Sequence, residues 1–235
     1  MLVSHENIIL VDDNGNIISS FQPEVVSLGG SIFFSGNSTS NLSIANDVDF
    51  RMGTGDFTIE WFQNQNDNNP YPRVFSIGSF PASIGVSIEG GTFYFWAGFA
   101  ISFGSVIPYK NQWVHFAISR QDSSLRVFKN GTQLGSTVTN TTNFNNTTNL
   151  LRIGNESTTS NLAAFGGNIT NFRWVKGSAL YTSNFSVPTS PLIAVNNTKL
   201  LLLASDELNA YKDSSGLNKI INNSNVSWSN TKPFI

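Results

Sequence analysis

The feature that most constrains the fold of this chain is a two-residue period in its apolar side chains, repeated along most of the sequence. Residues 57–61 (FTIEW), 73–77 (RVFSI) and 85–89 (GVSIE) each alternate apolar and polar residues. Such alternation is typical of a β-strand that buries one face, and we find no convincing amphipathic helix. Further strands are expected at residues 92–96, 113–120, 125–129, 150–153, 169–175 and 199–203.

The segments between these runs carry turn residues. Gly90 and Gly91 separate two of the strands, and residues 121–124 form a short polar loop. The dipeptide Asn130-Gly131 is the strongest short-range signal for a β-hairpin. Many short strands joined by such turns predict an all-β antiparallel sandwich or jelly roll.

The same alternation assigns one face of each strand to a shared core. A core residue of this kind stabilises the fold by about 1.5–3 kcal/mol when it is fully buried. The expected core residues are Phe57, Ile59, Trp61, Phe75, Ile77, Val86, Ile88, Phe93, Phe95, Val114, Phe116, Ile118, Leu125, Val127, Leu151 and Ile153.

The chain has 235 residues and no cysteine, so this core must stabilise the fold without disulfide bonds. Charged residues make up 12% of the chain, about half the usual share of roughly 25%. Asn, Ser and Thr, which number 30, 31 and 18, supply the missing polarity. These side chains hydrogen-bond without charge, which suits a neutral partner such as a glycan. Alternatively, they only form the turns and the polar surface of an all-β protein.

Charge and hydropathy exclude two kinds of partner. The net charge of −2 leaves no basic face for the electrostatic binding of nucleic acid. The sequence has no run of roughly 18 apolar residues that would cross a membrane. His5, Glu6, Asp12 and Asp13 interrupt the apolar residues near the start, so we expect no secretory signal peptide.

We expect three parts: an N-terminal edge segment at residues 1–27, a jelly roll at residues 28–205, and a C-terminal turn and edge strand at residues 206–235. Residues 12–18 and 213–221 both look like a turn led by aspartate and followed by an edge strand, although Asp-x-x-Gly turns are common. The C-terminal part either belongs to the same domain or forms an arm that reaches a neighbouring subunit.

Five stretches in the middle of the chain resemble the laminin-G-like branch of the concanavalin A-like lectin/glucanase superfamily. They are residues 55–61 (GDFTIEW), 113–120 (WVHFAISR), 125–131 (LRVFKNG), 151–154 (LRIG) and 165–174 (FGGNITNFRW). Their order and spacing agree with the family over about residues 28–190. The resemblance implies an antiparallel two-sheet jelly-roll sandwich. By itself it implies no ligand, because one fold hosts many functions.

Three further segments indicate which variety of this domain the chain resembles. Residues 179–188 (beginning ALYTSNF), 200–202 (LLL) and 213–216 (DSSG) look like the variety of this domain found in phage, giant-virus and environmental microbial proteins. This implies a location on the surface of a virion or a cell. The partners it implies are a glycan, other surface or virion proteins, or further copies of the same chain.

The carboxylates do not form the pattern of a glycosidase. Glucanases of the superfamily carry Glu-x-Asp-x-x-Glu on one strand, and retaining hydrolysis needs two carboxyl groups about 5–5.5 Å apart. Here no second carboxylate follows Glu60 at the right spacing, and the adjacent Asp206 and Glu207 would face opposite sides of a strand. His5 and His115 form no His-Glu-x-x-His motif. We therefore expect no enzymatic activity, and we expect His115 to be a packing or hydrogen-bonding residue.

Calcium is the one cofactor that the resemblance implies, because laminin-G-like relatives often hold a calcium ion at the rim of the sandwich. Asp47, Asp49 and Asp67 lie in or next to predicted turns and are the candidate ligands. The sequence has no contiguous calcium-binding loop, and the alternative is that these aspartates cap the backbone of their own turns.

Aromatic residues are the main candidates for ligand binding. If Phe93 and Phe95 face the core, Tyr94 and Trp96 face away from it. An exposed ring beside arginine and amide groups suits a sugar, because the ring stacks on C–H groups while polar groups hold the hydroxyls. Alternatively, a loop or a partner subunit covers these rings. The residues expected to join this outward face are Glu60, His115, Arg126, Arg152 and Arg173.

A second candidate site is the polar loop at residues 66–73, where Asn68, Tyr71 and Arg73 lie at the rim of the predicted sheet. Two functions follow from these observations. The first is a non-catalytic recognition or adhesion module that binds a glycan. The alternative is a structural virion or fibre protein that acts through protein–protein contacts.

Overall fold

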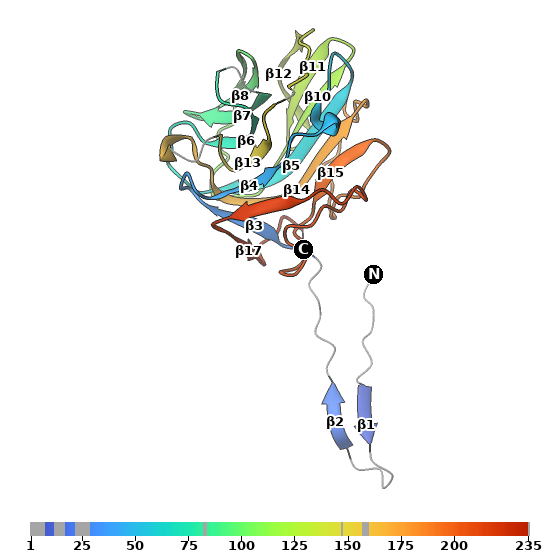
Figure 1. Ribbon diagram of the computed structural model, residues 1–235. Coiled ribbons are helices and arrows are strands. Elements are labelled where there is room, and N and C mark those ends of the chain that lie inside the picture. Colours follow the sequence, from blue (N-terminus) through green and yellow to red (C-terminus); the bar gives the residue numbers. More distant parts are fainter. Residues whose placement is uncertain are drawn as a thin grey trace.

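The computed structural model describes residues 8–11, 17–21, 29–81, 84–146, 148–156 and 160–234. Within these residues the chain is almost entirely β-structure (Figure 1). Its helical elements there are two short 3₁₀ turns, η1 (Val48–Phe50) and η2 (Asn161–Ala163). Among the described residues, no helix is long and apolar enough to span a membrane.

The larger sheet has eight strands, and all of its pairs are antiparallel. Strand β5 lies at its centre between β10 and β14. In spatial order the strands are β12 (Thr132–Thr139), β11 (Ser124–Lys129), β10 (Val114–Gln121), β5 (Phe57–Gln65), β14 (Gly166–Lys176), β3 (Ser31–Ser35) and β17 (Val226–Ser229), with β15 (Thr198–Leu202) paired to β14.

The smaller sheet has seven antiparallel strands and packs against the first (Figure 1). This confirms the predicted two-sheet antiparallel sandwich, and every expected strand is present. The spatial order is β16 (Ile221–Ser224), β4 (Asn41–Ile44), β13 (Leu151–Ile153), β6 (Arg73–Ile77), β7 (Ile84–Glu89), β8 (Thr92–Ala97) and β9 (Ala100–Ser105). Strands β1 (Ile8–Val11) and β2 (Ile17–Phe21) pair with each other.

Side chains from both sheets meet in one core. Every residue that the alternation assigned to the core is buried. Trp61 on β5 lies among them, with ring centroids 5.7 Å from Phe116 on β10 and 5.9 Å from Phe75 on β6. Because Phe75 belongs to the smaller sheet, Trp61 links the two sheets. Such aromatic pairs add about 0.5–1.5 kcal/mol to the stabilisation from buried area.

The inward face of β5 becomes polar toward the end of the strand. Gln63 and Gln65 follow Trp61 at the two-residue period and are fully buried. The Trp61 indole N–H donates to Gln63 Oε1 (2.7 Å), Gln63 Nε2 donates to Gln65 Oε1 (3.2 Å), and Gln65 Nε2 donates to Asp67 (3.3 Å). This chain of hydrogen bonds, which we name the β5 amide ladder, satisfies polar groups that would otherwise be costly to bury.

The outward face of β5 is also buried. It is covered by residues 177–197, which connect β14 to β15 in the sequence. We name these residues the covering segment. Leu180 N–H donates to Thr58 Oγ1 (2.8 Å), and Phe185 N–H donates to the Gly131 carbonyl (2.9 Å). The Phe185 carbonyl oxygen would lie 2.0 Å from a Cβ atom at position 131, so the predicted Asn130-Gly131 turn needs glycine for this contact. Both turn residues have positive φ angles, 48° and 76°.

The C-terminal part adds an edge strand to each sheet, since β16 pairs with β4 and β17 pairs with β3. Asp213 forms the expected turn before them. Its carboxylate accepts hydrogen bonds from the backbone N–H groups of Ser215 (2.9 Å) and Lys219 (3.0 Å). The similar motif at residues 12–16 lies outside the described residues. The domain boundaries drawn from the sequence stay predictions.

Two phenylalanines test the assignment of the core. Phe93 is fully buried, whereas Phe99, between β8 and β9, is 56% exposed. We expect Phe93→Ala to lower the free energy of unfolding by about 3–5 kcal/mol, because it leaves a cavity. Phe99→Ala should change it by less than about 0.5 kcal/mol. Urea denaturation followed by tryptophan fluorescence measures both, and equal effects would contradict the assignment.

Candidate functional site

An arginine surrounded by aromatic rings lies on the outer surface of the smaller sheet. Arg73 begins β6, and its guanidinium carbon lies 3.9 Å from the ring centroid of Phe80, 5.5 Å from that of Trp96 and 6.0 Å from that of Tyr71. Cations attract ring faces at such distances. Phe80 also packs edge-on against Trp96 at 4.6 Å. We name these four residues, together with Tyr94, the Arg73 face.

The strand pairing explains why Trp96 points outward and stays in place. Trp96 follows the buried Phe95 on β8, so the alternation turns its ring away from the core. Its indole N–H donates to Ser87 Oγ on the neighbouring strand β7 (2.9 Å). Trp96 and Tyr94 are both partly exposed, and Tyr71 is 47% exposed. The surface therefore presents fixed, accessible aromatic rings.

Two carboxylates contact Arg73. Glu89 Oε1 lies 2.5 Å from Arg73 Nη1, and Glu156 Oε2 lies 3.8 Å from Arg73 Nε. Glu89 also accepts a hydrogen bond from Ser87 (2.8 Å), and Glu156 accepts one from the Phe80 N–H (2.9 Å). Both acids are thus paired with one guanidinium that is itself largely buried, and they act to hold Arg73 in position.

Next to the Arg73 face is a polar cleft of about 230 Å³, which we name the Arg152 cleft. Arg152 on β13 pairs with Ser76 on β6, so both side chains project from the same outer surface. The Arg152 guanidinium makes no hydrogen bond or ion pair with the described residues, so its five N–H donors are available to a ligand. The lining residues are Ser76, Gly78, Ser79, Thr148, Asn149, Leu150, Arg152 and Glu156.

The structure therefore brings together five of the residues singled out in the sequence. Tyr71, Arg73, Tyr94, Trp96 and Arg152 all lie on the outer surface of the smaller sheet, and Glu156 joins the Arg73 face to the Arg152 cleft. Tyr71 and Arg73 were assigned to a separate loop site, whereas the structure makes them part of one surface with Trp96.

Two of the predicted site residues lie elsewhere. Arg126 was expected beside Trp96, which is wrong, because it belongs to β11 in the larger sheet. Its guanidinium makes only a long hydrogen bond, 3.4 Å, to the Ser124 carbonyl among the described residues. Asn68 is exposed, and its side chain accepts a hydrogen bond from Lys110 Nζ (3.1 Å), which ties it to the loop before β10.

Glu60, His115 and Arg173 were expected on the same outward face as Tyr94, which is also wrong. They lie on the outer side of the larger sheet and are 0%, 1% and 5% exposed under the covering segment. Glu60 Oε1 accepts from Arg173 Nε (2.9 Å), and Glu60 Oε2 contacts His115 Nε2 (3.1 Å) and accepts from the Tyr181 hydroxyl (2.9 Å). The expectation that His115 packs and hydrogen-bonds is confirmed.

The charge of Glu60 is stabilised by these partners. Burial alone would raise the pKa of Glu60, but the hydrogen bond from His115 and the positive charge of Arg173 outweigh it and hold the pKa below its usual value of 4.5. An ionised carboxylate only accepts hydrogen bonds, so His115 Nε2 carries the proton in their shared bond. Glu60 is therefore a structural anion at neutral pH.

The three aspartates proposed as calcium ligands do not fit a calcium site. Asp47 and Asp49 both bind Lys219 Nζ at 2.8 Å, and Asp49 also lies 3.5 Å from Lys199 Nζ, so ammonium groups already serve as the cations of this pair. Asp67 accepts from the Gly166 N–H (2.6 Å) and the Asn69 N–H (2.9 Å), and burial raises its pKa. Among the described residues, no group of three or more His, Asp and Glu side chains is placed to hold a metal ion. Asp47 and Asp67 instead fit the alternative role stated for them, because each accepts a hydrogen bond from a backbone N–H group of its own turn.

Sequence reasoning missed Phe80, Glu89 and Glu156 as members of this surface. Glu89 had a usable signal, because it follows Ser87 at the two-residue period on an alternating strand. Phe80 and Glu156 lie in loops, where no periodicity indicates the direction of a side chain.

The sequence model of the concanavalin A-like lectin/glucanases superfamily matches residues 35–180, which is more than half of the chain. The chain belongs to this superfamily. The matched residues include the whole of β5, β10 and β14, which form the centre of the larger sheet. None of the curated proteins compared with the chain matches it in sequence.

Solved structures share the fold at low sequence identity. A Bacteroides ovatus protein described as a “putative carbohydrate binding protein” aligns with a TM-score of 0.63 and 13% identity over 89% of this chain and 62% of its own. A heptameric SAP-like pentraxin of Limulus polyphemus aligns with a TM-score of 0.57 and 13% identity over 88% of this chain and 97% of its own. The extracellular region of zebrafish Gpr126 aligns with a TM-score of 0.56 and 15% identity over 88% of this chain and 27% of its own. The chain thus spans less than two thirds of the Bacteroides protein.

The buried Glu60 network gives a pH-dependent prediction. We expect Glu60→Gln to lower the free energy of unfolding by about 3–5 kcal/mol at neutral pH, because it leaves Arg173 buried without its counter-ion. The folded-state pKa of Glu60 is depressed, so its contribution is present above pH 4.5 and is lost as the pH falls through the folded-state value. The difference between the two proteins should therefore shrink in acid.

Urea denaturation at a series of pH values measures this difference. The matched control is Glu207→Gln, at an exposed position, which should change the free energy of unfolding by less than about 0.5 kcal/mol. A difference between Glu60→Gln and the unmodified protein that is the same at acid and neutral pH would contradict the assigned role of Glu60.

Proposed function

We propose that the protein is a non-catalytic recognition module that binds a glycan on the outer surface of the smaller sheet. The observation that carries this proposal is the position of exposed aromatic rings on the Arg73 face beside the unpaired guanidinium of the Arg152 cleft. A module of this kind would meet its glycan at the surface of a virion or a cell.

The chemistry of the two neighbouring surfaces suits the two sides of a sugar. Sugar rings carry patches of C–H groups, which pack on the partly exposed rings of Tyr71 and Trp96. Arg152, Asn149 and Ser79 line the adjacent cleft and offer hydrogen bonds to hydroxyl groups. Binding sites of this kind combine apolar contact with a few directed polar groups. The fold-level likeness to the Bacteroides protein, which is described as a “putative carbohydrate binding protein”, agrees with this chemistry.

The pairing of the carboxylates supports a role without catalysis. Glycoside hydrolysis needs two carboxyl groups that flank a bond of the substrate. Glu89 and Glu156 instead share the Arg73 guanidinium, which holds both of them in position. Glu60, the acid on the central strand, is buried and is also paired with arginine.

Binding to an array of immobilised glycans tests the proposal. We expect Arg152→Ala to weaken binding at least about tenfold, because a hydrogen bond to a charged group contributes about 1.5–3 kcal/mol. Tyr71→Ala should weaken it as well, through the loss of the exposed ring. Arg126→Ala is the matched control, since it removes the same side chain from the larger sheet and should leave binding unchanged.

Three results would count against this proposal: an array without a bound glycan, binding that Arg152→Ala and Tyr71→Ala leave unaltered, or equal losses in Arg152→Ala and Arg126→Ala. Because the aspartates do not fit a calcium site, binding should persist in EDTA.

One observation favours the alternative of a structural protein that acts through protein–protein contacts. Leu208 and Ile220 are 96% and 79% exposed, and both line the same hollow in the C-terminal part. Exposed apolar groups of this kind mark protein interfaces. If this hollow joins copies of the chain, sedimentation should show concentration-dependent association that Ile220→Asp abolishes, while a monomer at all concentrations would remove self-association as the basis of this function.

A further inference from the structure

We propose a second binding site, on the larger sheet, that takes a small uncharged aromatic compound. The site is a cavity of about 470 Å³ beside Trp113, Phe62 and Phe234. Its volume lies within the range of roughly 300–1,000 Å³ that is typical of pockets for small molecules. It lies on the opposite sheet from the Arg73 face and does not depend on the proposed glycan binding.

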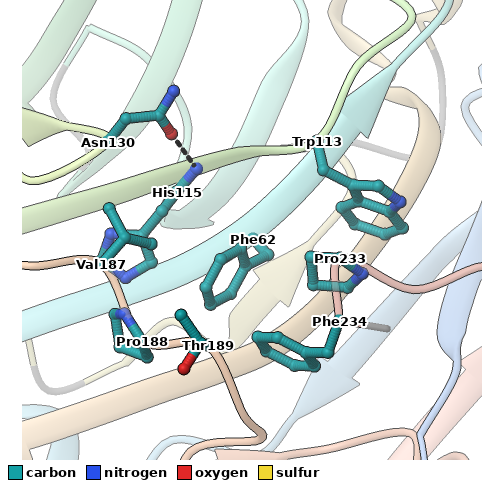
Figure 2. A pocket seen from close by; sticks show the side chains of 9 residues that line it. All are labelled: Phe62, Trp113, His115, Asn130, Val187, Pro188, Thr189, Pro233 and Phe234. Carbon is teal, nitrogen blue, oxygen red and sulfur yellow. Dashed lines mark hydrogen bonds between the residues drawn. The ribbon is translucent and has the colours of Figure 1, made fainter.

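Five separate parts of the chain build this cavity, and one of them is Asn130 in the turn between β11 and β12 (Figure 2). Phe62 projects from the outer side of β5, and Trp113 immediately precedes β10. Residues 187–189 of the covering segment form one wall, and Pro233 and Phe234 form another. Because the walls come from parts of the chain that are distant in sequence, the cavity is a product of the folded structure.

The apolar walls are mainly aromatic. Phe62 is nearly fully buried, and its ring lies 5.1 Å from that of Phe234 in an edge-on arrangement and 4.6 Å from that of His115. Trp113 and Phe234 border the cavity (Figure 2). Both are partly exposed, so their rings offer surface to a ligand. Aromatic rings prefer such edge-on and offset contacts with one another, which favours a ligand that carries a ring.

The charge of the walls selects against ions. None of the nine lining residues is Asp, Glu, Lys or Arg. His115 is the one titratable group among them, and its Nε2 atom is already bonded to Glu60. A charged ligand would lose its hydration here without gaining a counter-ion, which is costly in a largely apolar cavity. The ligand is therefore uncharged.

The polar groups of the cavity suit one or two hydrogen bonds. Asn130 Oδ1 accepts from the His115 N–H (2.9 Å), which leaves the Asn130 amide N–H groups without a partner among the described residues. The Thr189 hydroxyl and the Trp113 indole N–H likewise make no hydrogen bond there. A sugar, which carries a hydroxyl on most of its carbons, would leave several hydroxyls unpaired, whereas phenol or indole would not.

His115 adds a second observation that points to a ligand. Its Nδ1 atom is buried and has no hydrogen-bond partner in the described part of the chain. With Nε2 donating to Glu60, a neutral imidazole leaves Nδ1 as an acceptor. A buried polar atom without a partner costs about 1–3 kcal/mol. Because Nδ1 has almost no accessible surface in the free protein, the His115 ring must turn toward the cavity before an O–H or N–H group of a ligand can bond it.

Titration with indole and with phenol, followed by NMR of the whole chain, tests this site. We expect saturable binding at millimolar concentration or tighter, as befits ligands of this size, with shifts at Trp113 and at the His115 imidazole nitrogens. Methyl glucoside and benzoate, which test for a sugar and for an anion, should not shift these signals.

Two variants locate the binding. Trp113→Ala should weaken indole binding about tenfold by removing one ring. Thr189→Trp adds bulk at an exposed position of the wall and should block binding while leaving the melting temperature unchanged. Trp96→Ala on the Arg73 face and Arg152→Ala in the Arg152 cleft are the controls, and both should bind indole as the unmodified chain does.

The proposal is overturned if indole and phenol cause no saturable shifts, if Thr189→Trp binds indole unchanged, or if methyl glucoside or benzoate binds in their place. Loss of glycan binding in Arg152→Ala with indole binding retained supports both sites. Indole binding without any glycan binding supports this site alone.

Discussion

Strand β5 is buried on both of its faces, and most of the structure depends on how each face is covered. On the inner side, Trp61 packs against aromatic rings from both sheets. On the outer side, Glu60 binds Arg173 of β14 and Tyr181 of the covering segment, so one anion links a central pair of strands to an irregular stretch of chain. A buried ion pair of this type stabilises little relative to apolar packing, but the loss of one partner is costly. The covering segment therefore stays on the sheet and forms a wall of the cavity beside Trp113.

The strands and the inner core could be predicted because burial of one face imposes a two-residue period. That period is absent where an irregular segment, rather than the opposite sheet, buries the side chains. Tyr181, which bonds Glu60, and Phe185, which packs on His115, lie in an irregular segment, so nothing in their spacing indicates that the outer side of β5 is closed. Strand β12 was not among the expected strands, because it is an exposed edge strand from which only Leu134 and Val138 pack on the core.

In the candidate site, too, some features could be predicted from the sequence and others could not. Alternation placed Tyr94 and Trp96 outside correctly, since it reports the face of a strand on which a side chain lies. It does not report the sheet to which the strand belongs. Arg126 and Arg152 therefore looked equivalent in the sequence, although the pairing of β11 and β13 places them on opposite sides of the molecule. Which strands pair depends on contacts between residues far apart in the chain, and a single sequence carries little information about them.

The β5 amide ladder has a consequence for strand alignment. A shift of β5 by two residues against its neighbours keeps every apolar side chain on the inner face, so the hydrophobic pattern alone does not oppose it. The same shift would carry the amide of Gln63 toward the position of Trp61, among phenylalanine rings, where it would find no partner. The buried glutamines thus select one register among several that would bury the same apolar side chains. They give a sandwich without disulfide bonds a single alignment of its central strand.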